Sequence, residues 1–213
     1  MKPVISFVDI EEKWEIEYLN KALDDIASVR SFSETADLVL DKASDTNILS
    51  TFIQSKVDKK VIDSLPALKF ITTRSTGFDH IDVEYARSKG IPVSNVPTYG
   101  ENTVAEHTFA LILSIARNLK KSHSRASEGD FSIKELMGFD LKGRTIGVVG
   151  TGHIGLRVIK MAVGFSMNVL AFDPTPNSFL SEMLGFKYVD FETLLKESDI
   201  ISLHAPYNKR THH

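Results

Sequence analysis

Three glycines stand at the spacing of a phosphate-binding turn. They belong to the run Gly150-Thr151-Gly152-His153-Ile154-Gly155, which directly follows the apolar residues 145–149. A glycine turn between a strand and a helix leaves backbone N–H groups unpaired at the helix N-terminus, where they bind phosphate. We expect Gly150 to permit the tight turn, Gly152 to let a pyrophosphate approach the backbone, and Gly155 to let helix and strand pack closely. The alternative is a merely flexible loop, which this strand-and-helix setting disfavours.

An acidic residue follows the next apolar run. Asp173 comes directly after residues 167–172 and 18 residues after Gly155, close to the roughly 20 at which a carboxylate contacts the adenosine ribose. A carboxylate there accepts hydrogen bonds from both ribose hydroxyls and repels a 2′-phosphate, and no Lys or Arg lies in residues 173–178 to attract one. These residues therefore favour NAD over NADP as the cofactor. The alternative is that Asp173 is only a turn residue before Pro174.

The hydrophobic pattern predicts the elements that position these residues. Short apolar runs alternate with amphipathic stretches along the chain, as is typical of parallel sheets covered by helices. Before residue 100 we expect strands over 4–8, 47–53, 68–73 and 91–94, and helices over 12–27, 58–65 and 82–89, the last capped by Asp82 and ended by Gly90. After it we expect strands over 145–149, 167–172 and 199–203, and helices over 102–119, 154–163, 179–184 and 191–196. The fold class is therefore α/β, with one small domain in residues 1–99 and another in residues 100–213.

The segment from Asn102 to Leu119 is apolar on nearly every side, which predicts a buried helix and not a surface helix. One half-domain does not obviously cover that much apolar surface. We therefore expect a homodimer formed through this region. The polar stretch 120–130 is expected to follow the helix.

Composition excludes several classes of function. The chain of 213 residues has no cysteine, which excludes disulfides, thiolate metal sites and cysteine nucleophiles. Its 25 Lys and Arg against 28 Asp and Glu form no block of like charge, so we expect no nucleic-acid partner and no metal site. Residues 1–10 are broken by Asp9 and predict a strand rather than a signal peptide. Residues 104–119 contain Glu106, His107 and Arg117 and fall short of the roughly 18 apolar residues of a membrane span. We expect a cytoplasmic protein with a small-molecule substrate and no membrane partner.

Four further segments occur in a telling order along the chain. They are Arg74-Ser75-Thr76-Gly77-Phe78-Asp79-His80-Ile81-Asp82, Asn95-Val96-Pro97-Thr98-Tyr99, Val104-Ala105-Glu106-His107-Thr108 and Leu203-His204-Ala205-Pro206. Together they resemble the successive signatures of the D-isomer-specific 2-hydroxyacid dehydrogenases. Tyr99 and the His-Ile pair at 153–154 most resemble the D-lactate dehydrogenase branch. The resemblance implies a flavodoxin-like substrate domain in residues 1–99, followed by the first half of a Rossmann NAD-binding domain in residues 100–213.

The resemblance also implies roles in substrate binding. Thr76 and Gly77 would hold the substrate carboxylate with their backbone N–H groups, which a turn offers as an anion-binding nest. Tyr99 would flank the substrate. The alternatives are that Gly77 only supplies a positive φ and that Tyr99 is simply a half-buried aromatic residue.

Further cofactor contacts follow from the same resemblance. His153 and Ile154 would lie along the pyrophosphate, and Asp173 on the ribose. The neighbouring loop would contribute Ala205, Pro206 and Thr211.

His80, His107 and His204 are expected to be structural. His80 and His107 stand beside Asp79 and Glu106, but neighbours in sequence on a strand or helix point in different directions. His204 is expected to pack or hydrogen-bond rather than to act as an acid or base.

Oxidation of a 2-hydroxy acid needs a hydride acceptor, a group that moves the hydroxyl proton and a cation that binds the carboxylate. The resemblance assigns the last two roles to an Arg, a Glu and a His that follow the Leu-His-Ala-Pro segment, and the chain ends at His213 before them. We therefore expect no catalytic residue in this chain and no turnover by it. The chain is either a truncated part of a normal enzyme, which we favour, or a naturally short nucleotide-binding protein.

The expected activity of the parent protein is hydride transfer between NAD and a small D-2-hydroxy acid or 2-oxo acid, with D-lactate and pyruvate favoured. The alternatives within the family are glyoxylate, hydroxypyruvate, phosphoglycerate and formate dehydrogenases. An alternative of a different class is a non-catalytic protein that binds a partner in response to NADH.

Overall fold

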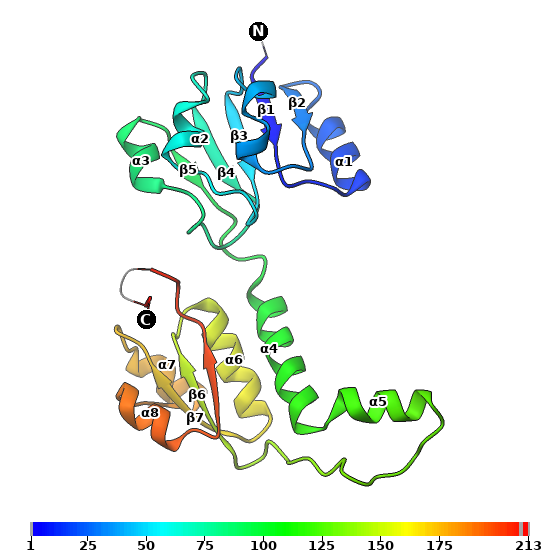
Figure 1. The fold of residues 1–213 in the computed structure, drawn as a ribbon. Helices are drawn as coiled ribbons and strands as arrows, with labels where there is room; N and C mark the ends of the chain where they lie inside the picture. Colours follow the sequence, from blue (N-terminus) through cyan, green and yellow to red (C-terminus); the bar gives the residue numbers. More distant parts are fainter. Residues whose placement is uncertain (1, 209–210, 213) are drawn as a thin grey trace. The chain divides into compact units, whose positions relative to one another are not determined.

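The computed structural model describes residues 2–208 and 211–212. The chain forms two compact units, Met1–Tyr99 and Gly100–His213, which are traced in the colours of the sequence in Figure 1. Each unit is an α/β layer with its own parallel sheet and its own core. The functions that the sequence assigns to the two domains stay predictions.

The first unit has the strand order of a flavodoxin-like sheet. Its strands β1 to β5 are parallel and lie in the order β2-β1-β3-β4-β5, the order known from flavodoxin-like folds. The strands are β1 (Val4–Phe7), β2 (Ser28–Ser31), β3 (Ile48–Thr51), β4 (Phe70–Thr73) and β5 (Val93–Ser94). The helices are α1 (Lys13–Leu23), α2 (Lys59–Asp63) and α3 (Val83–Ser88), with short 3-10 turns η1 (Ala36–Leu38) and η2 (Leu40–Lys42).

Local capping explains where the helices of this unit begin and end. The Asp58 side chain accepts hydrogen bonds from two backbone N–H groups of the first turn of α2, and Asp82 accepts one from Tyr85 in α3. Gly90 follows α3 with φ +73°, a conformation that only glycine adopts at little cost. The predicted cap and stop of this helix are confirmed.

The second unit has the strand order of half a Rossmann sheet. Its parallel strands lie in the order β8-β7-β6-β9. The chain adds β7 and β8 on one side of β6 and then β9 on the other side. α/β proteins bind ligands at such a switch in strand order, which here lies between β6 and β9. The strands are β6 (Thr145–Val149), β7 (Asn168–Phe172), β8 (Lys187–Tyr188) and β9 (Ile200–Leu203). The helices are α4 (Glu101–Ala116), α5 (Leu119–Ser127), α6 (His153–Gly164), α7 (Ser178–Leu184) and α8 (Phe191–Glu197).

Helix α4 is less buried within the chain than its sequence predicts. Helix α4 buries one face, formed by Ala105, Phe109, Ile112 and Ala116, and is not covered on every side. Within its unit it packs against α6, and Ile115 on the other face is 72% exposed. The polar stretch after it is largely helical, because α5 occupies Leu119–Ser127.

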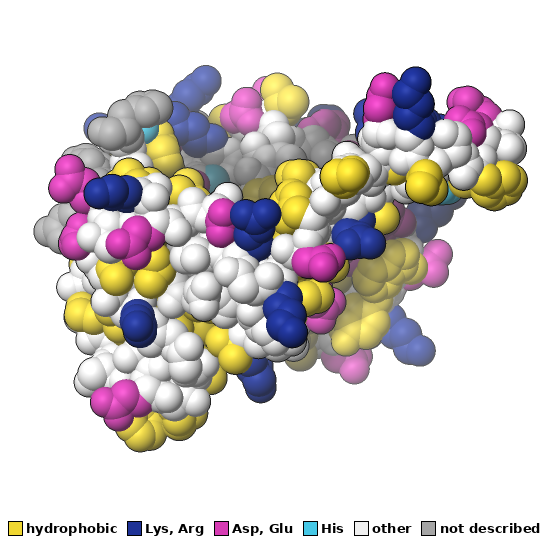
Figure 2. All heavy atoms as spheres, turned by 90° about the horizontal axis from the view of Figure 1, so that it is seen from below, with side chains coloured by type: hydrophobic (Ala, Val, Ile, Leu, Met, Phe, Trp, Pro, Cys, Tyr) yellow, Lys and Arg dark blue, Asp and Glu magenta, His cyan; other side chains and the backbone are white. Residues whose placement is uncertain are grey.

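The surface mixes charge and apolar side chains. Figure 2 shows Lys and Arg interspersed with Asp and Glu on one face, with hydrophobic side chains exposed between them. None of the helices in the described part of the chain combines the length and the apolar character needed to cross a bilayer.

Candidate cofactor site

The three glycines of the turn after β6 lie in three different surroundings. Gly150 has φ +94°, and a Cβ there would lie 2.7 Å from the carbonyl oxygen of His204. A Cβ on Gly155 would lie 2.0 Å from the carbonyl oxygen of Gly150, so this glycine allows α6 to approach the turn. A Cβ on Gly152 would meet no atom within 4 Å. The turn therefore excludes side chains at two glycines for folding and leaves open space at the third.

The N-terminus of α6 faces this open space without a protein cap. Gly152 is the N-cap residue, and it has no side chain to accept a hydrogen bond from the first turn. That turn contains no acidic residue. Unpaired N–H groups and the positive end of a 12-residue helix together favour an anion such as a pyrophosphate.

His153, which begins α6, pairs with an acidic residue that the sequence analysis missed. Its Nδ1 lies 3.2 Å from Oε1 of Glu101 in the first turn of α4, and the guanidinium of Arg157 lies 3.6 Å from Oε2. The Glu101 side chain is only 13% exposed. His153 and Arg157 are four residues apart and share a helix face, but their pairing with a residue about 50 positions earlier leaves no local signal. Of these residues, His153 lies at the N-terminus of α6, next to the proposed anion site.

Asp173 lies directly after β7 and contacts the glycine turn. Its Oδ2 accepts hydrogen bonds from the backbone N–H of Thr151 at 2.8 Å and from the Thr151 hydroxyl at 3.0 Å. Its Oδ1 accepts one from the N–H of Thr175 at 2.9 Å. Partial burial raises the pKa of Asp173, but these hydrogen bonds outweigh it and hold the pKa below its ordinary value. Asp173 is therefore a fixed, ionised carboxylate.

These contacts reduce the number of hydrogen bonds that Asp173 can accept from a ribose. A carboxylate has about four acceptor positions on its two oxygens, and the contacts with Thr151 and Thr175 occupy three of them. The open position lies on Oδ1. This arrangement has room for one ribose hydroxyl, whereas the sequence analysis assumed two.

The loop after β9 reaches the glycine turn. The backbone nitrogen of Ala205 lies 3.1 Å from the position of a Cβ on Gly150. The Thr211 hydroxyl donates to the carbonyl oxygen of Pro206 at 2.6 Å, which closes the loop on itself. The structure thus brings Ala205 beside the turn, as the predicted cofactor contact requires. His204 is half-buried, hydrogen-bonds to Ser202 at 2.8 Å, and has its pKa lowered by burial, in keeping with the structural role expected for it.

Comparison with known proteins identifies the family and the fold. Residues 109–213 match the family model of the D-isomer specific 2-hydroxyacid dehydrogenase, NAD binding domain. Over 98% of its length the chain superposes on D-lactate dehydrogenase from Aquifex aeolicus, solved with NAD and lactic acid, with a TM-score of 0.91 and 38% identity. The apo-structure of D-lactate dehydrogenase from Escherichia coli matches with a TM-score of 0.82 and 30% identity, and the chain covers 67% of it. This chain belongs to the D-isomer-specific 2-hydroxyacid dehydrogenases.

The family assignment confirms the expected fold and the expected cofactor, NAD. It does not select a substrate, because a glyoxylate reductase from Thermococcus litoralis is 39% identical over 183 residues, which is 83% of this chain. The chain spans about half the length of the curated relatives, 55% of that glyoxylate reductase, and 62% of the Aquifex aeolicus structure.

The segment expected to bind the substrate carboxylate follows β4 in the first unit of the chain. The Thr76 hydroxyl donates to the carbonyl oxygen of Val96, and the Ser75 hydroxyl donates to that of Gly77. Within the described residues, the backbone N–H groups of Thr76 and Gly77 donate to no protein acceptor. Gly77 does not have a positive φ, so the alternative that it only permits a left-handed turn is wrong. Two free N–H groups remain available for an anion.

Within the described residues, neither His80 nor His107 forms a hydrogen bond or ion pair with the acidic residue beside it. Nε2 of His80 lies 3.2 Å from the Thr73 hydroxyl. Burial lowers the pKa of His80, although Asp79 and Asp9 act in the opposite direction. His107 is exposed on α4.

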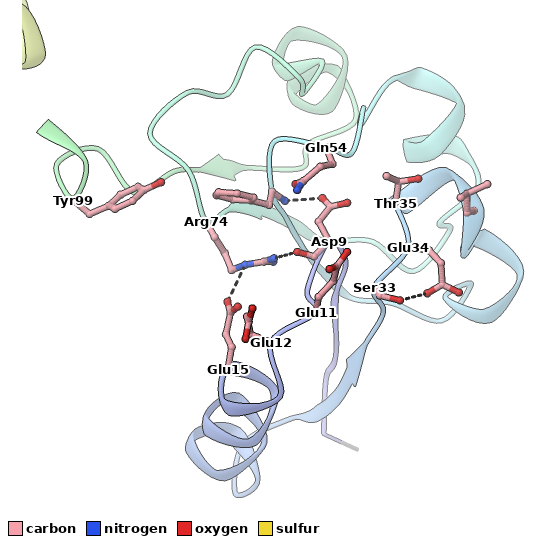
Figure 3. Close-up of a pocket in the computed structure, with 12 residues that line it drawn as sticks. Asp9, Glu11, Glu12, Glu15, Ser33, Glu34, Thr35, Gln54, Arg74 and Tyr99 are labelled. Atoms are coloured by element: carbon pink, nitrogen blue, oxygen red, sulfur yellow. Dashed lines mark hydrogen bonds and ion pairs between the residues drawn. The ribbon is translucent and has the colours of Figure 1, made fainter. Parts of the chain in front are cut away.

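Tyr99 lines a cavity of about 660 Å³ that does not suit a carboxylate (Figure 3). The wall contains Arg74 but also five acidic residues, Asp9, Glu11, Glu12, Glu15 and Glu34. Arg74 is already bound by the carbonyl oxygens of Val8, Asp9 and Ser50 and lies 3.5 Å from Glu15. Thr76 and Gly77 do not line this cavity. The structure therefore does not bring Tyr99 together with the other two predicted substrate residues in one cavity.

Proposed function

We propose that the protein containing this chain transfers hydride between NAD(H) and a small D-2-hydroxy acid or its 2-oxo acid. The observation that carries the proposal is the turn at Gly152, where open space meets an uncapped helix N-terminus beside Asp173. D-lactate and pyruvate are the favoured pair, supported by the similar Aquifex aeolicus enzyme, which was solved with lactic acid. The similarity to a glyoxylate reductase supports glyoxylate as the alternative substrate.

The residues of this chain divide the binding work between them. The first-turn N–H groups of α6 bind the pyrophosphate, with His153 and Ile154 alongside it, and Asp173 accepts a ribose hydroxyl. Ala205, Pro206 and Thr211 contact the cofactor from the loop after β9. The N–H groups of Thr76 and Gly77 bind the substrate carboxylate. When bound, NAD supplies the hydride acceptor.

We propose that these 213 residues bind NAD without turnover. An acid/base histidine must face the substrate, and the histidines described above are hydrogen-bonded within the fold, exposed on α4 or paired beside the pyrophosphate position. Oxidation of NADH by this chain with pyruvate would contradict the proposal, because one of these histidines would then have to donate the proton that the carbonyl oxygen of pyruvate takes up. Spectrophotometry at the NADH absorption band measures this directly.

Calorimetric titration of the chain with NADH tests the cofactor part of the proposal, and saturable binding at one site is expected. A longer version of the protein, assayed with pyruvate, glyoxylate, hydroxypyruvate, phosphohydroxypyruvate and formate, tests the substrate part. Pyruvate is expected to give the highest kcat/KM. A higher value for glyoxylate would select the alternative substrate, and failure to bind NADH would contradict the whole function.

We propose further that the chain forms a homodimer through α4 and the arm that follows it, residues 117–140. Ile115 on α4 is 72% exposed, and Phe131, Ile133 and Met137 on the arm are each more than four-fifths exposed. Exposed large apolar side chains are typical of an interface when they form a patch.

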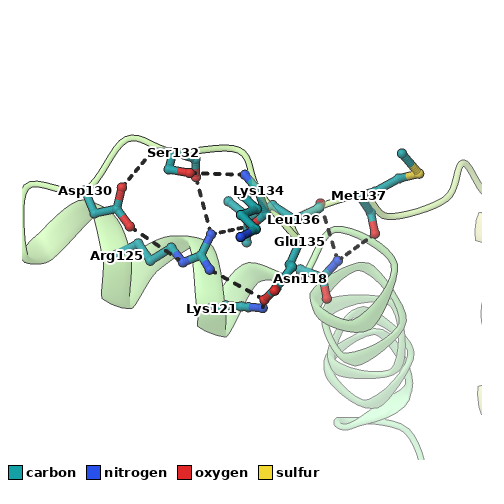
Figure 4. Close-up of polar contacts among 9 residues, drawn as sticks. All are labelled: Asn118, Lys121, Arg125, Asp130, Ser132, Lys134, Glu135, Leu136 and Met137. Atoms are coloured by element: carbon teal, nitrogen blue, oxygen red, sulfur yellow. Dashed lines mark hydrogen bonds and ion pairs between the residues drawn. The ribbon is translucent and has the colours of Figure 1, made fainter.

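Polar contacts among residues 118–137 hold the arm in shape (Figure 4). The Asn118 side chain donates to the carbonyl oxygens of Leu136 and Met137, and Lys121 lies 2.7 Å from Glu135. Sedimentation should give twice the chain mass, and Ile115→Glu should give a monomer. Ile26→Glu is the matched control, because Ile26 is comparably exposed in the first unit. A monomer in the unchanged protein at micromolar concentration would contradict the dimer.

A further inference from the structure

Two side chains connect β8 to the Asp173 carboxylate through their hydroxyl groups. The Thr151 hydroxyl donates to Oδ2 of Asp173 and lies 2.9 Å from the Tyr188 hydroxyl. A threonine hydroxyl has one proton to donate. Because that proton goes to Asp173, Tyr188 must be the donor in its contact with Thr151. The direction of the hydroxyl chain is therefore fixed, from Tyr188 through Thr151 to Asp173.

The fold holds Tyr188 firmly at the start of this hydroxyl chain. Tyr188 pairs with Ala171 in the register of β8 with β7. It therefore lies on the strand next to β7, close to the end of β7 from which Asp173 follows. Its ring packs edge-to-face on the buried Phe186, with centroids 5.0 Å apart. Neither contact uses the hydroxyl. The hydroxyl group thus serves Thr151 and not the packing of β8.

We propose that Tyr188 and Thr151 are positioning residues that set the selectivity of Asp173 for a ribose without a 2′-phosphate. This inference rests on the proposed NAD binding and adds the residues that tune it. The two residues help to fix the carboxylate with Oδ2 against the glycine turn, which leaves one acceptor position of Oδ1 open beside the contact with the Thr175 N–H.

A fixed carboxylate favours NAD over NADP because it cannot rotate away from a 2′-phosphate. A 2′-phosphate brought to the open Oδ1 meets a negative charge and finds no donor, while a 2′-hydroxyl donates to it. Without the Thr151 hydroxyl, one hydrogen bond fewer holds Oδ2, and the carboxylate gains freedom to rotate from a phosphate. Binding of NADPH then becomes less unfavourable, while NADH loses a preorganised acceptor.

The test is the ratio of NADPH to NADH dissociation constants, measured by calorimetry for single and double variants. Thr151→Val should lower the ratio roughly 3- to 10-fold, which corresponds to the loss of one hydrogen bond. Tyr188→Phe should lower it in the same direction by a smaller factor. Thr151→Ser keeps a hydroxyl and should keep the ratio of the unchanged protein. Tyr18→Phe, at an exposed tyrosine of the first unit, is the matched control and should change nothing.

The double variant separates positioning from direct contact. If Tyr188 acts through Thr151, adding Tyr188→Phe to Thr151→Val changes the ratio no further. An equal effect of Tyr188→Phe in both backgrounds would overturn the inference, because Tyr188 would then act on the cofactor by another route. A ratio unchanged by Thr151→Val would overturn it as well. Thermal unfolding of each variant identifies any ratio that reflects misfolding.

A measurement without nucleotide keeps the inference distinct from the proposed function. Carboxyl NMR titration should show that Thr151→Val raises the pKa of Asp173 toward the ordinary value, while Thr151→Ser leaves it low. No change in this pKa would overturn the positioning role even if NADH binds. Failure of the unchanged protein to bind NADH would instead contradict the proposed function, whatever the titration shows.

Discussion

Replacing Gly152 with alanine should separate cofactor binding from folding. The residue has φ −71° and ψ −168°, an extended conformation that alanine adopts, and the added methyl group would meet no protein atom within 4 Å. Alanine caps a helix less well than glycine but reduces the freedom of the unfolded chain. These effects oppose each other, so the free energy of unfolding should change by less than about 1 kcal/mol.

Cofactor binding should respond much more strongly to the same methyl group. It occupies the space in which a pyrophosphate approaches the N–H groups of α6 and pushes the phosphate away from them. Losing one hydrogen bond to a charged group costs about 1.5–3 kcal/mol, so NADH should bind roughly 10- to 150-fold more weakly. Calorimetric titration with NADH and urea unfolding, carried out on the same samples, measure both effects.

Two other glycines provide the comparison. Gly164→Ala, at the exposed end of α6 where an added Cβ also meets nothing within 4 Å, should leave NADH binding unchanged. Gly155→Ala places a Cβ 2.0 Å from a backbone oxygen and should lower the free energy of unfolding by about 1–3 kcal/mol. NADH affinity that survives Gly152→Ala would refute the assignment of the open space to a pyrophosphate.

Three further outcomes are expected. Asp173→Asn should raise NADPH affinity relative to NADH by roughly 10-fold, measured by calorimetry, because the charge that repels a 2′-phosphate is gone. Arg74→Met should lower the free energy of unfolding in urea by about 2–4 kcal/mol, because the carbonyl oxygens of Val8, Asp9 and Ser50 lose their donor; a smaller loss than 1 kcal/mol would mean that water replaces it. Burial lowers the pKa of His80 and His204. The contribution of these two neutral side chains to stability is therefore complete above the ordinary histidine pKa of about 6.5 and is lost as pH falls through their folded-state pKa values. Urea unfolding from pH 7.5 to 5 should show this loss of stability, and His204→Asn should make the loss smaller.

Much of this fold and site could be predicted from short stretches of sequence. Asp82, Gly90 and the glycine turn act through their own backbone conformation or their immediate neighbours, so their positions in sequence were sufficient. Strands β2 and β8 were missed because they lie at sheet edges, have four and two residues, and show no apolar alternation. The exposed face of α4 was misjudged because apolar composition does not reveal how many neighbours a helix has.

Long-range contacts explain what the sequence left out at the site. The number of free acceptor positions on Asp173 depends on its hydrogen bonds with Thr151. The Thr151 hydroxyl in turn contacts Tyr188, 37 residues later. No spacing rule links these positions, because their proximity comes from the pairing of β8 with β7. Glu101 likewise reaches His153 only because α4 packs on α6.

The strand register explains why separate sequence signals form one site. Val149 of β6 pairs with Phe172 of β7 and with Leu203 of β9, so three parallel strands end level. The next residues, Gly150, Asp173 and His204, must then emerge side by side at the carboxyl edge of the sheet. A slip of one residue in either pairing would move Asp173 from Thr151 or His204 from Gly150, and the turn would lose its carboxylate or its neighbouring loop. The register of β6 with its two neighbours therefore determines this site as directly as the glycines do.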